Sequence, residues 1–221
     1  SALVTVLFCT VDLLSTSMQR PHIHVFLGIS LDGCIAGAGH SLQWLEAYAS
    51  DPPETTGYTD LIAWADTVLM GRHTWEAIEG MAPLPFTDLR LAVLTHRPLK
   101  TGSPARSVQG PLEDVLQQLW NDGARRVYLD GGDVVRQALQ RGLVDRLTLT
   151  WVPMVLGDGI RLFDSGLPTS RWTREAVRTL PSGLVQVQYA PVALPDRLLS
   201  PSPATPSGTD AAPAHPCRSS P

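Results

Sequence analysis

Short runs of apolar and β-branched residues alternate along this chain with stretches in which apolar residues recur at helical spacing. Residues 24–30 (HVFLGIS) are mostly apolar, which is typical of a central strand covered on both faces. Similar runs predict strands at 67–70, 91–95, 126–129 and 146–152. Helices are predicted at 42–49, 59–65, 74–79 and 133–141, with one more beginning near residue 111. Strands that alternate with helices indicate an α/β fold.

Two consecutive β-rich runs close this pattern. Residues 172–179 and 184–189 are joined by Pro181, Ser182 and Gly183, which predicts an antiparallel hairpin. The chain as a whole therefore predicts a mixed, mostly parallel sheet flanked by helices and closed by a C-terminal antiparallel hairpin.

The two ends differ in composition from the middle. Residues 1–19 are mostly small and apolar and have no basic residue, so we expect an N-terminal extension that is not native before Met18, which is the expected natural start of the protein. An additional packed element is the alternative. Residues 195–221 are rich in Pro, Ser, Ala and Thr, which predicts a disordered tail. The folded domain is expected over 20–194.

Charge and cysteine content narrow the possible partners. A net charge of −4 argues against a nucleic-acid coat or a binder of anionic membranes. Three widely spaced cysteines provide neither a disulfide framework nor a zinc site, and they suit a cytoplasmic protein. His22 and His24 share one face of a predicted strand, but no third ligand follows at metal-binding spacing, so we expect no metal.

Candidate chemistry gathers where predicted strands run into helices. Residues 70–74 (MGRHT) and 129–133 (LDGGD) are two such junctions, and Thr95 with Arg97 follows a third strand. In open α/β sheets, ligands bind beyond the carboxyl ends of the strands, and glycines there let backbone N–H groups approach an anion. The combination favours a nucleotide site, although neither G-x-G-x-x-G nor a P-loop motif is present.

The residues that carry these junctions resemble a known family. TVLMGRHTWE at 67–76 is similar to the phosphate-binding strand and turn of dihydrofolate reductases. Together with SLDGCIAG at 30–37 and the DGG and GLVD motifs within 128–163, it most resembles the reductase domain of bacterial riboflavin-biosynthesis enzymes and its stand-alone relatives. The resemblance covers nearly all of 22–190 and implies a dihydrofolate-reductase-like fold.

The resemblance also implies a binding site for NADPH. The residues that would contact its phosphates and ribose are Gly71, Arg72, Thr74, Thr95, Arg97, Gly131, Gly132, Asp133 and Val134. Those that would lie along its nicotinamide are Gly28, Ile35 and Ala36. Thr95 and Arg97 would lie near the 2′-phosphate, which favours NADPH over NADH. Trp44 and Glu46 are the candidates on the substrate side.

Asp130 and Asp32 are the candidate catalytic residues. Reduction of a C=N bond needs a proton, so Asp130 could orient the substrate or assist proton delivery, or it could only cap the turn that it begins. Asp32 likewise either faces the site or forms part of an Asp-Gly turn. Two positions depart from the riboflavin-pathway enzymes, which commonly have lysine where this chain has Phe26 and glutamate in place of Asp130.

We therefore expect an NADPH-dependent oxidoreductase that transfers a hydride to a small pterin-like or pyrimidine-like heterocycle. By resemblance it would form a homodimer. The alternatives are a non-catalytic nucleotide-binding protein that has kept the fold and a reductase of broad specificity.

Overall fold

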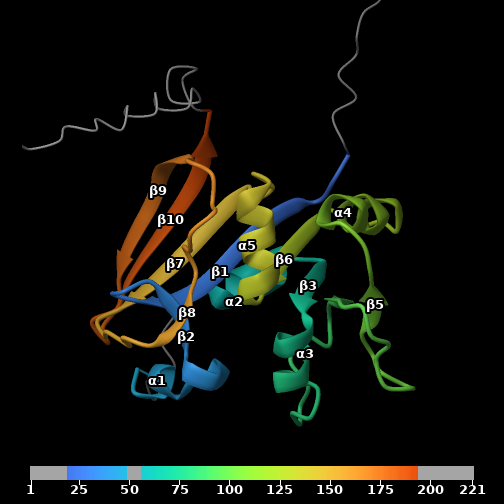
Figure 1. Cartoon of the computed structure of the whole chain (residues 1–221), viewed down its shortest axis with the longest axis horizontal. Coiled ribbons are helices and arrows are strands. Elements are labelled where there is room, and N and C mark those ends of the chain that lie inside the picture. The colour runs from blue at the N-terminus through green and yellow to red at the C-terminus, as the bar shows by residue number, and fades with distance from the viewer. Residues whose placement is uncertain (1–18, 49–55, 194–221) are drawn as a thin grey trace, which may run out of the picture.

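The structure is a computed structural model that describes residues 19–48 and 56–193. Eight strands form one sheet in the order β5-β4-β3-β6-β1-β7-β10-β9 (Figure 1). In chain order they are β1 (His22–Ser30), β3 (Thr67–Gly71), β4 (Arg90–Leu94), β5 (Arg106–Val108), β6 (Arg126–Asp130), β7 (Arg146–Val152), β9 (Arg171–Thr179) and β10 (Val185–Val192). The six strands from β5 to β7 are parallel, and β10 and β9 are antiparallel additions at one edge. The predicted mixed sheet and its closing hairpin are confirmed.

Three short strands were not predicted from the sequence. They are β5, β2 (Cys34–Gly37) and β8 (Gly159–Arg161), and β2 pairs with β8 as a small separate sheet. Each has only three or four residues, which is too few for an alternating pattern to become visible. The helix predicted at 42–49 is also shorter in the structure, where α1 covers Gln43–Glu46 and a 3₁₀ turn, η1 (Ala38–His40), precedes it.

Helices cover both faces of the large sheet. Alternation along β3 sends Val68 and Met70 into the core under α2 (Tyr58–Trp64) and α3 (Arg72–Ile78), whereas Leu69 joins the core under α4 (Leu112–Asn121) and α5 (Gly132–Gln140). Figure 1 shows α5 crossing in front of the central strands. The parallel strands have near-continuous apolar sequences because helices bury them on both faces.

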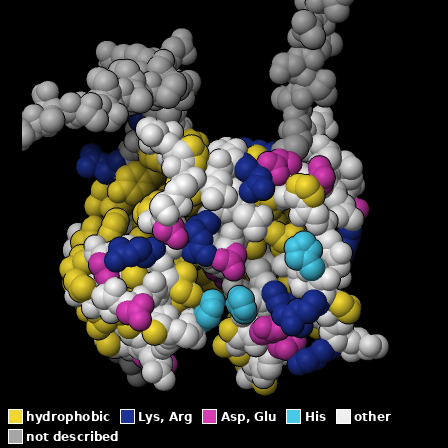
Figure 2. Space-filling model, in the orientation of Figure 1, with side chains coloured by type: hydrophobic (Ala, Val, Ile, Leu, Met, Phe, Trp, Pro, Cys, Tyr) yellow, Lys and Arg dark blue, Asp and Glu magenta, His cyan; other side chains and the backbone are white. Residues whose placement is uncertain are grey.

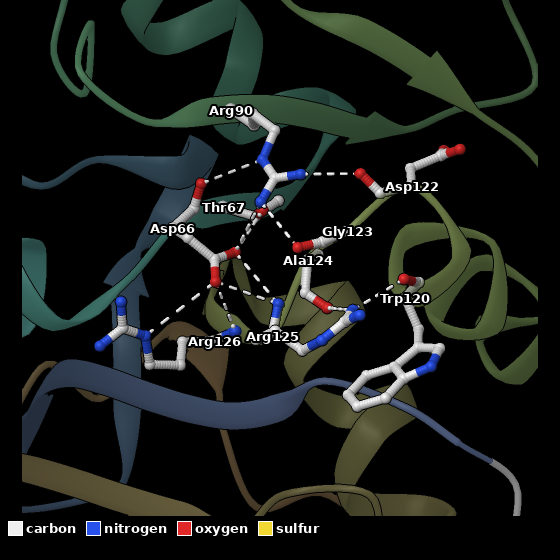
Figure 3. Close-up of polar contacts among 9 residues, drawn as sticks. All are labelled: Asp66, Thr67, Arg90, Trp120, Asp122, Gly123, Ala124, Arg125 and Arg126. Carbon is white, nitrogen blue, oxygen red and sulfur yellow. Dashed lines mark hydrogen bonds and ion pairs between the residues drawn. The ribbon is translucent and has the colours of Figure 1, made fainter.

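A polar network closes the amino ends of β3, β4 and β6 (Figure 3). The carboxylate of Asp66 accepts hydrogen bonds from the backbone N–H groups of Arg125 and Arg126, both at 3.0 Å. The Arg90 guanidinium donates to the carbonyl oxygens of Asp122 at 2.9 Å and Gly123 at 3.1 Å. These bonds hold three strand starts together at the edge opposite the glycine-containing junctions.

The predicted ends of the chain fall mostly outside the described residues. Of the extension predicted at 1–19, only Gln19 is described, and its side-chain oxygen accepts a hydrogen bond from Trp120 Nε1 at 3.1 Å. The tail predicted at 195–221 is not described, and the domain limits therefore remain predictions. Within 19–48 and 56–193, no helix combines the length and the apolar sequence that crossing a bilayer requires.

Candidate active site

The ends of β3 and β6 lie side by side, with Met70 paired to Asp130 in register. Gly71 and Gly131 follow these residues directly and bring the two backbones close together. A Cβ atom on Gly131 would collide with Thr74 Oγ1 and lie 3.5 Å from the Gly71 nitrogen. Gly131 also has φ of 95°, a conformation that L side chains rarely adopt. Both observations require glycine at this position.

Two more close approaches complete a cradle, which we define as Ile35, Gly71, Thr74, Gly131 and Gly132. A Cβ atom on Gly132 would lie 2.7 Å from Ile35 Cδ1, and one on Gly71 would lie 3.3 Å from Val134 Cγ2. The predicted residues from β2, β3, α3 and α5 are thereby brought together. The open backbone at the start of α5 presents N–H groups that suit an anionic oxygen.

The two arginines predicted to hold phosphates lie beside the cradle. Arg72 Nε pairs with Glu76 Oε1 at 2.7 Å, and its Nη1 donates to the Pro98 carbonyl at 3.1 Å. The hydrogen bond from Arg72 lowers the pKa of Glu76. Thr95 Oγ1 accepts the Arg97 N–H at 3.2 Å and so shapes the loop that follows β4. Thr95 therefore positions the loop from which the exposed Arg97 projects.

Asp133 occupies the first turn of α5 and is exposed. Its carboxylate forms a short ion pair with Arg136, whose Nη1 also donates to the Arg161 carbonyl at 2.9 Å. The Arg136 side chain therefore links α5 to β8. The contact with the cofactor that was predicted for Asp133 would be made by the Asp133 backbone.

Asp130 lies at the carboxyl end of β6, enclosed by protein atoms but not fully buried. Burial raises the pKa of Asp130 to about 6, against the opposing effect of the Gly131 N–H, which donates to its carboxylate at 2.8 Å, and of the Tyr128 hydroxyl. A carboxyl group of this pKa can carry or release a proton close to neutral pH. The bond to Gly131 shows the capping role, and the role of Asp130 in proton delivery stays a prediction.

An aromatic row beside Asp130 was missed at the sequence level. Tyr128 lies two residues earlier on the same face of β6, and its ring centroid is 6.3 Å from that of Tyr58 on α2. Tyr58 in turn lies 5.8 Å from Phe26 on β1. Burial, followed by the charge of Asp130, raises the pKa of Tyr58 to about 12. The spacing of Tyr128 from Asp130 was the available signal, whereas nothing local indicated Tyr58.

Asp32 lies in the turn after β1 and is occupied by hydrogen bonds. Its carboxylate accepts from Ser30 Oγ at 2.6 Å and from the backbone N–H groups of Leu156 at 3.1 Å and Gly157 at 2.9 Å. The Ser30 hydrogen bond and the backbone bonds hold the pKa of Asp32 far below its usual range. A permanently ionised, fully engaged carboxylate favours the turn interpretation, and its catalytic role stays a prediction.

The substrate-side candidates lie on α1, across β1 from the cradle. Trp44 is buried against Val152 and Leu184, and its indole N–H has no hydrogen-bond partner among the residues that the structure describes. Glu46 is exposed on the same helix. Between them Leu45 contacts β1, because a Cβ on Gly28 would lie 3.2 Å from Leu45 Cδ2. Gly28 thus admits Leu45 of α1 close to the sheet, and its predicted contact with the nicotinamide stays a prediction.

Residues of the small β2–β8 sheet approach the cradle from a third side. Ala36 is buried on β2, and its carbonyl oxygen lies 2.5 Å from where a Cβ of Gly159 would be. Beyond it, His40 of η1 stacks on His73 of α3 with ring centroids 4.7 Å apart. This contact between His40 and His73 joins the segment after β2 to α3, and the sequence did not predict it.

His22 and His24, considered as metal ligands, both pack edge-on against Trp64, each with centroids 5.6 Å from its ring. No cluster of three or more His, Cys, Asp or Glu side chains suited to a metal ion occurs in the described part of the chain.

The sheet order, the closing hairpin and the glycine-lined junctions define a protein of dihydrofolate-reductase-like fold. The chain belongs to the RibD C-terminal domain family, whose sequence profile matches residues 21–186. A candidate riboflavin biosynthesis protein from Shewanella sp. PV-4 superposes with a TM-score of 0.72 at 25% identity, over 78% of this chain and 99% of that one. A pyrimidine reductase-like protein from Corynebacterium diphtheriae gives 0.60 at 20% identity, over 78% and 92%.

Two proteins of Bacillus subtilis (strain 168) are similar in sequence. Uncharacterized protein YwjB is 29% identical over 160 residues, which is 66% of this chain and 84% of YwjB. Uncharacterized protein YyaP is 26% identical over 189 residues, 80% of this chain and 98% of YyaP.

Proposed function

We propose that this chain is an NADPH-dependent reductase that transfers a hydride to a small pyrimidine-like or pterin-like heterocycle. The observation that carries the proposal is the cradle at the carboxyl ends of β3 and β6, where glycines bring the backbones close to one another and to the side chains of Thr74 and Ile35. Membership of a family defined by a reductase domain supports the same activity.

The chemistry of the cradle residues suits a dinucleotide. Gly71, Gly131 and Gly132 would let the pyrophosphate lie against the backbone, with the Thr74 hydroxyl beside it. Arg72, which directly follows Gly71, and Arg97, whose charge acts on the same Glu76, are the arginines that we assign to its phosphates. Ile35 and Gly28 would flank the nicotinamide.

When bound, NADPH supplies the hydride, which adds to the carbon of a C=N bond in the heterocycle. The nitrogen of that bond then needs one proton, and we assign its delivery to the Asp130 carboxyl group. A pKa of about 6 makes protonated Asp130 available near neutral pH, and the resulting carboxylate recovers its proton from water. Tyr128 and the Gly131 N–H hold the carboxyl group in position throughout.

Titration with NADPH and with NADH tests the proposal by thermal shift, because a ligand that binds only the native state raises the melting temperature. We expect a larger shift with NADPH. Arg72→Ala and Arg97→Ala should each weaken NADPH binding about tenfold, and Arg97→Ala should narrow the preference over NADH. Arg106→Ala is the matched control, because Arg106 pairs with Asp122 far from the cradle. No shift with either nucleotide would favour the non-catalytic alternative.

We also propose that the protein forms a homodimer through the β9–β10 hairpin. Strand β9 is a sheet edge, and Val177 and Val185 are 49% and 37% exposed on one face of the hairpin. Figure 2 shows apolar side chains gathered over this region. Light scattering should give twice the chain mass of 23.9 kDa, and Val177→Lys should reduce it to one chain mass. A monomeric parent protein would refute this assembly.

A further inference from the structure

A separate cavity of about 240 Å³ lies between α2 and the strands β1, β7, β10 and β9. It opens on the same sheet face as Asp130, because His24, which lines it, pairs in register with Tyr128, and Asp130 follows two residues later. Its volume suits a single ring with one substituent rather than a whole cofactor.

The floor of the cavity is polar, which is unusual for a sheet face beneath a helix. His24, Thr148 and Gln186 form it and are only 8%, 3% and 6% exposed. His24 Nε2 shares a hydrogen bond with Thr148 Oγ1 at 2.9 Å, and Gln186 Nε2 donates to Thr150 Oγ1 at 2.9 Å. Among the described residues, His24 Nδ1 and Gln186 Oε1 make no hydrogen bond, so each can pair with a ligand.

Charges around the cavity are balanced. Arg146 pairs with Glu175 at 3.2 Å, and Gln188 Nε2 donates to the same carboxylate oxygen at 2.8 Å. Arg178 and Asp60 both approach Gly57 at the rim, within 3.1 and 4.0 Å of where its Cβ would lie.

His24 adds no charge to this balance. Burial, and then the charge of Arg146, lowers its pKa to about 4, so the ring is neutral at pH 7. Among the described residues, Arg146 and Arg178 line the cavity with Asp60, and Glu175 neutralises Arg146 from outside the lining, so neither sign of ligand charge is favoured.

Aromatic side chains form the walls. Trp64 of α2 and Phe26 of β1 line the cavity, and the ring of Phe26 also contacts Tyr58. The row Phe26–Tyr58–Tyr128 thus leads from this cavity to Asp130. A planar ring can pack against such walls while its polar atoms reach the floor.

We propose that this cavity is a specificity subsite that binds the end of the substrate remote from the reduced bond, and that this end is an uncharged, planar, hydrogen-bonding group of the aromatic carboxamide type. Its assignment to a substrate rests on the proposed reductase function. The specificity follows from the polar floor, the aromatic walls and the balance of charge among the described residues around them.

An isosteric series tests the charge selectivity directly. Benzamide, benzoate and benzamidine have nearly the same shape but carry zero, negative and positive charge. Calorimetric titration of the NADPH-saturated protein should show benzamide binding about tenfold or more tighter than either ion. Equal or tighter binding of benzoate or benzamidine would overturn the proposal.

Two variants locate the binding. Gln186→Leu removes one ligand partner and should weaken benzamide binding about fivefold. Ala176→Trp fills the cavity from the exposed edge strand β9 without removing any buried group, and it should abolish binding even if Gln186→Leu perturbs folding. Gln117→Leu, which removes an exposed amide on α4, is the matched control. Benzamide binding that survives Ala176→Trp would place the ligand elsewhere and refute the subsite.

Failure of the reductase proposal would give a different pattern. NADPH would then cause no thermal shift, whereas cofactor-free protein would bind benzamide with the same sensitivity to Ala176→Trp. That result would overturn the assignment to a reduced substrate, whereas loss of benzamide selectivity with intact NADPH binding would overturn the subsite alone.

Discussion

Replacement of Asp130 by asparagine tests whether this carboxyl group is held in a site that disfavours its charge. Burial raises its pKa from 3.8 to about 6, and the acidic group is therefore harder to ionise in the folded protein than in the unfolded chain. This group contributes its full stability at a pH below the pKa that Asp130 has in the unfolded chain. The contribution is lost as the pH rises through the pKa that Asp130 has in the folded protein. A pKa that is higher by about two corresponds to about 3 kcal/mol in the free energy of unfolding.

The asparagine side chain does not ionise, so the variant does not lose stability in this way as the pH rises. The free energy of unfolding of Asp130→Asn, minus that of the parent, should therefore increase between pH 4 and pH 7 by about 2 to 3 kcal/mol. Urea denaturation at pH 4, 5, 6 and 7 measures this difference. Changes in the hydrogen bonds to Gly131 and Tyr128 shift all four values together and do not alter the slope.

Asp133→Asn is the control, because it removes an exposed carboxylate three residues further along. The free energy of unfolding of Asp133→Asn, minus that of the parent, should not show this increase between pH 4 and pH 7, because the Asp133 side chain is exposed. A pH-independent difference for Asp130→Asn, or one that falls as pH rises, would refute the reasoning. The same variant should reduce turnover of the reductase while NADPH binding stays nearly intact.

Two further substitutions separate the cradle from the rest of the fold. Gly131→Ala should lower the free energy of unfolding by about 2 kcal/mol or more and abolish the NADPH thermal shift. The new Cβ would collide with Thr74, and alanine would also have to adopt the positive φ of this position. Gly102→Ala is the control, because Gly102 has φ of 80° but no atom within 4 Å of the added Cβ, and this variant should keep NADPH binding. Asp66→Ala should lower the free energy of unfolding by about 3 kcal/mol in urea denaturation, because several hydrogen-bond donors lose their acceptor. Asp66 lies at the opposite ends of the strands from the cradle, so NADPH affinity should stay the same. A changed affinity would contradict this separation.

Much of the fold follows from local patterns. Apolar strands of five residues or more, the closing hairpin and the glycine junctions at 71 and 131–132 were all predictable, because strand burial and turn geometry leave a signal within a few residues. Shorter elements such as β2 and β8 leave no such signal, because their pairing depends on residues about 125 positions apart.

The sequence by itself determined the class of the sheet, the protein family and the cradle glycines, since each depends on backbone conformation or on a contiguous motif. Tertiary structure alone decided the state of the charged and polar groups. It enclosed Asp130 and raised its pKa, engaged Asp32 with residues 156 and 157, directed Arg72 to Glu76, and assembled the polar cavity from four strands and α2. Burial and partner choice depend on side chains far apart in the chain, and only folding brings those together.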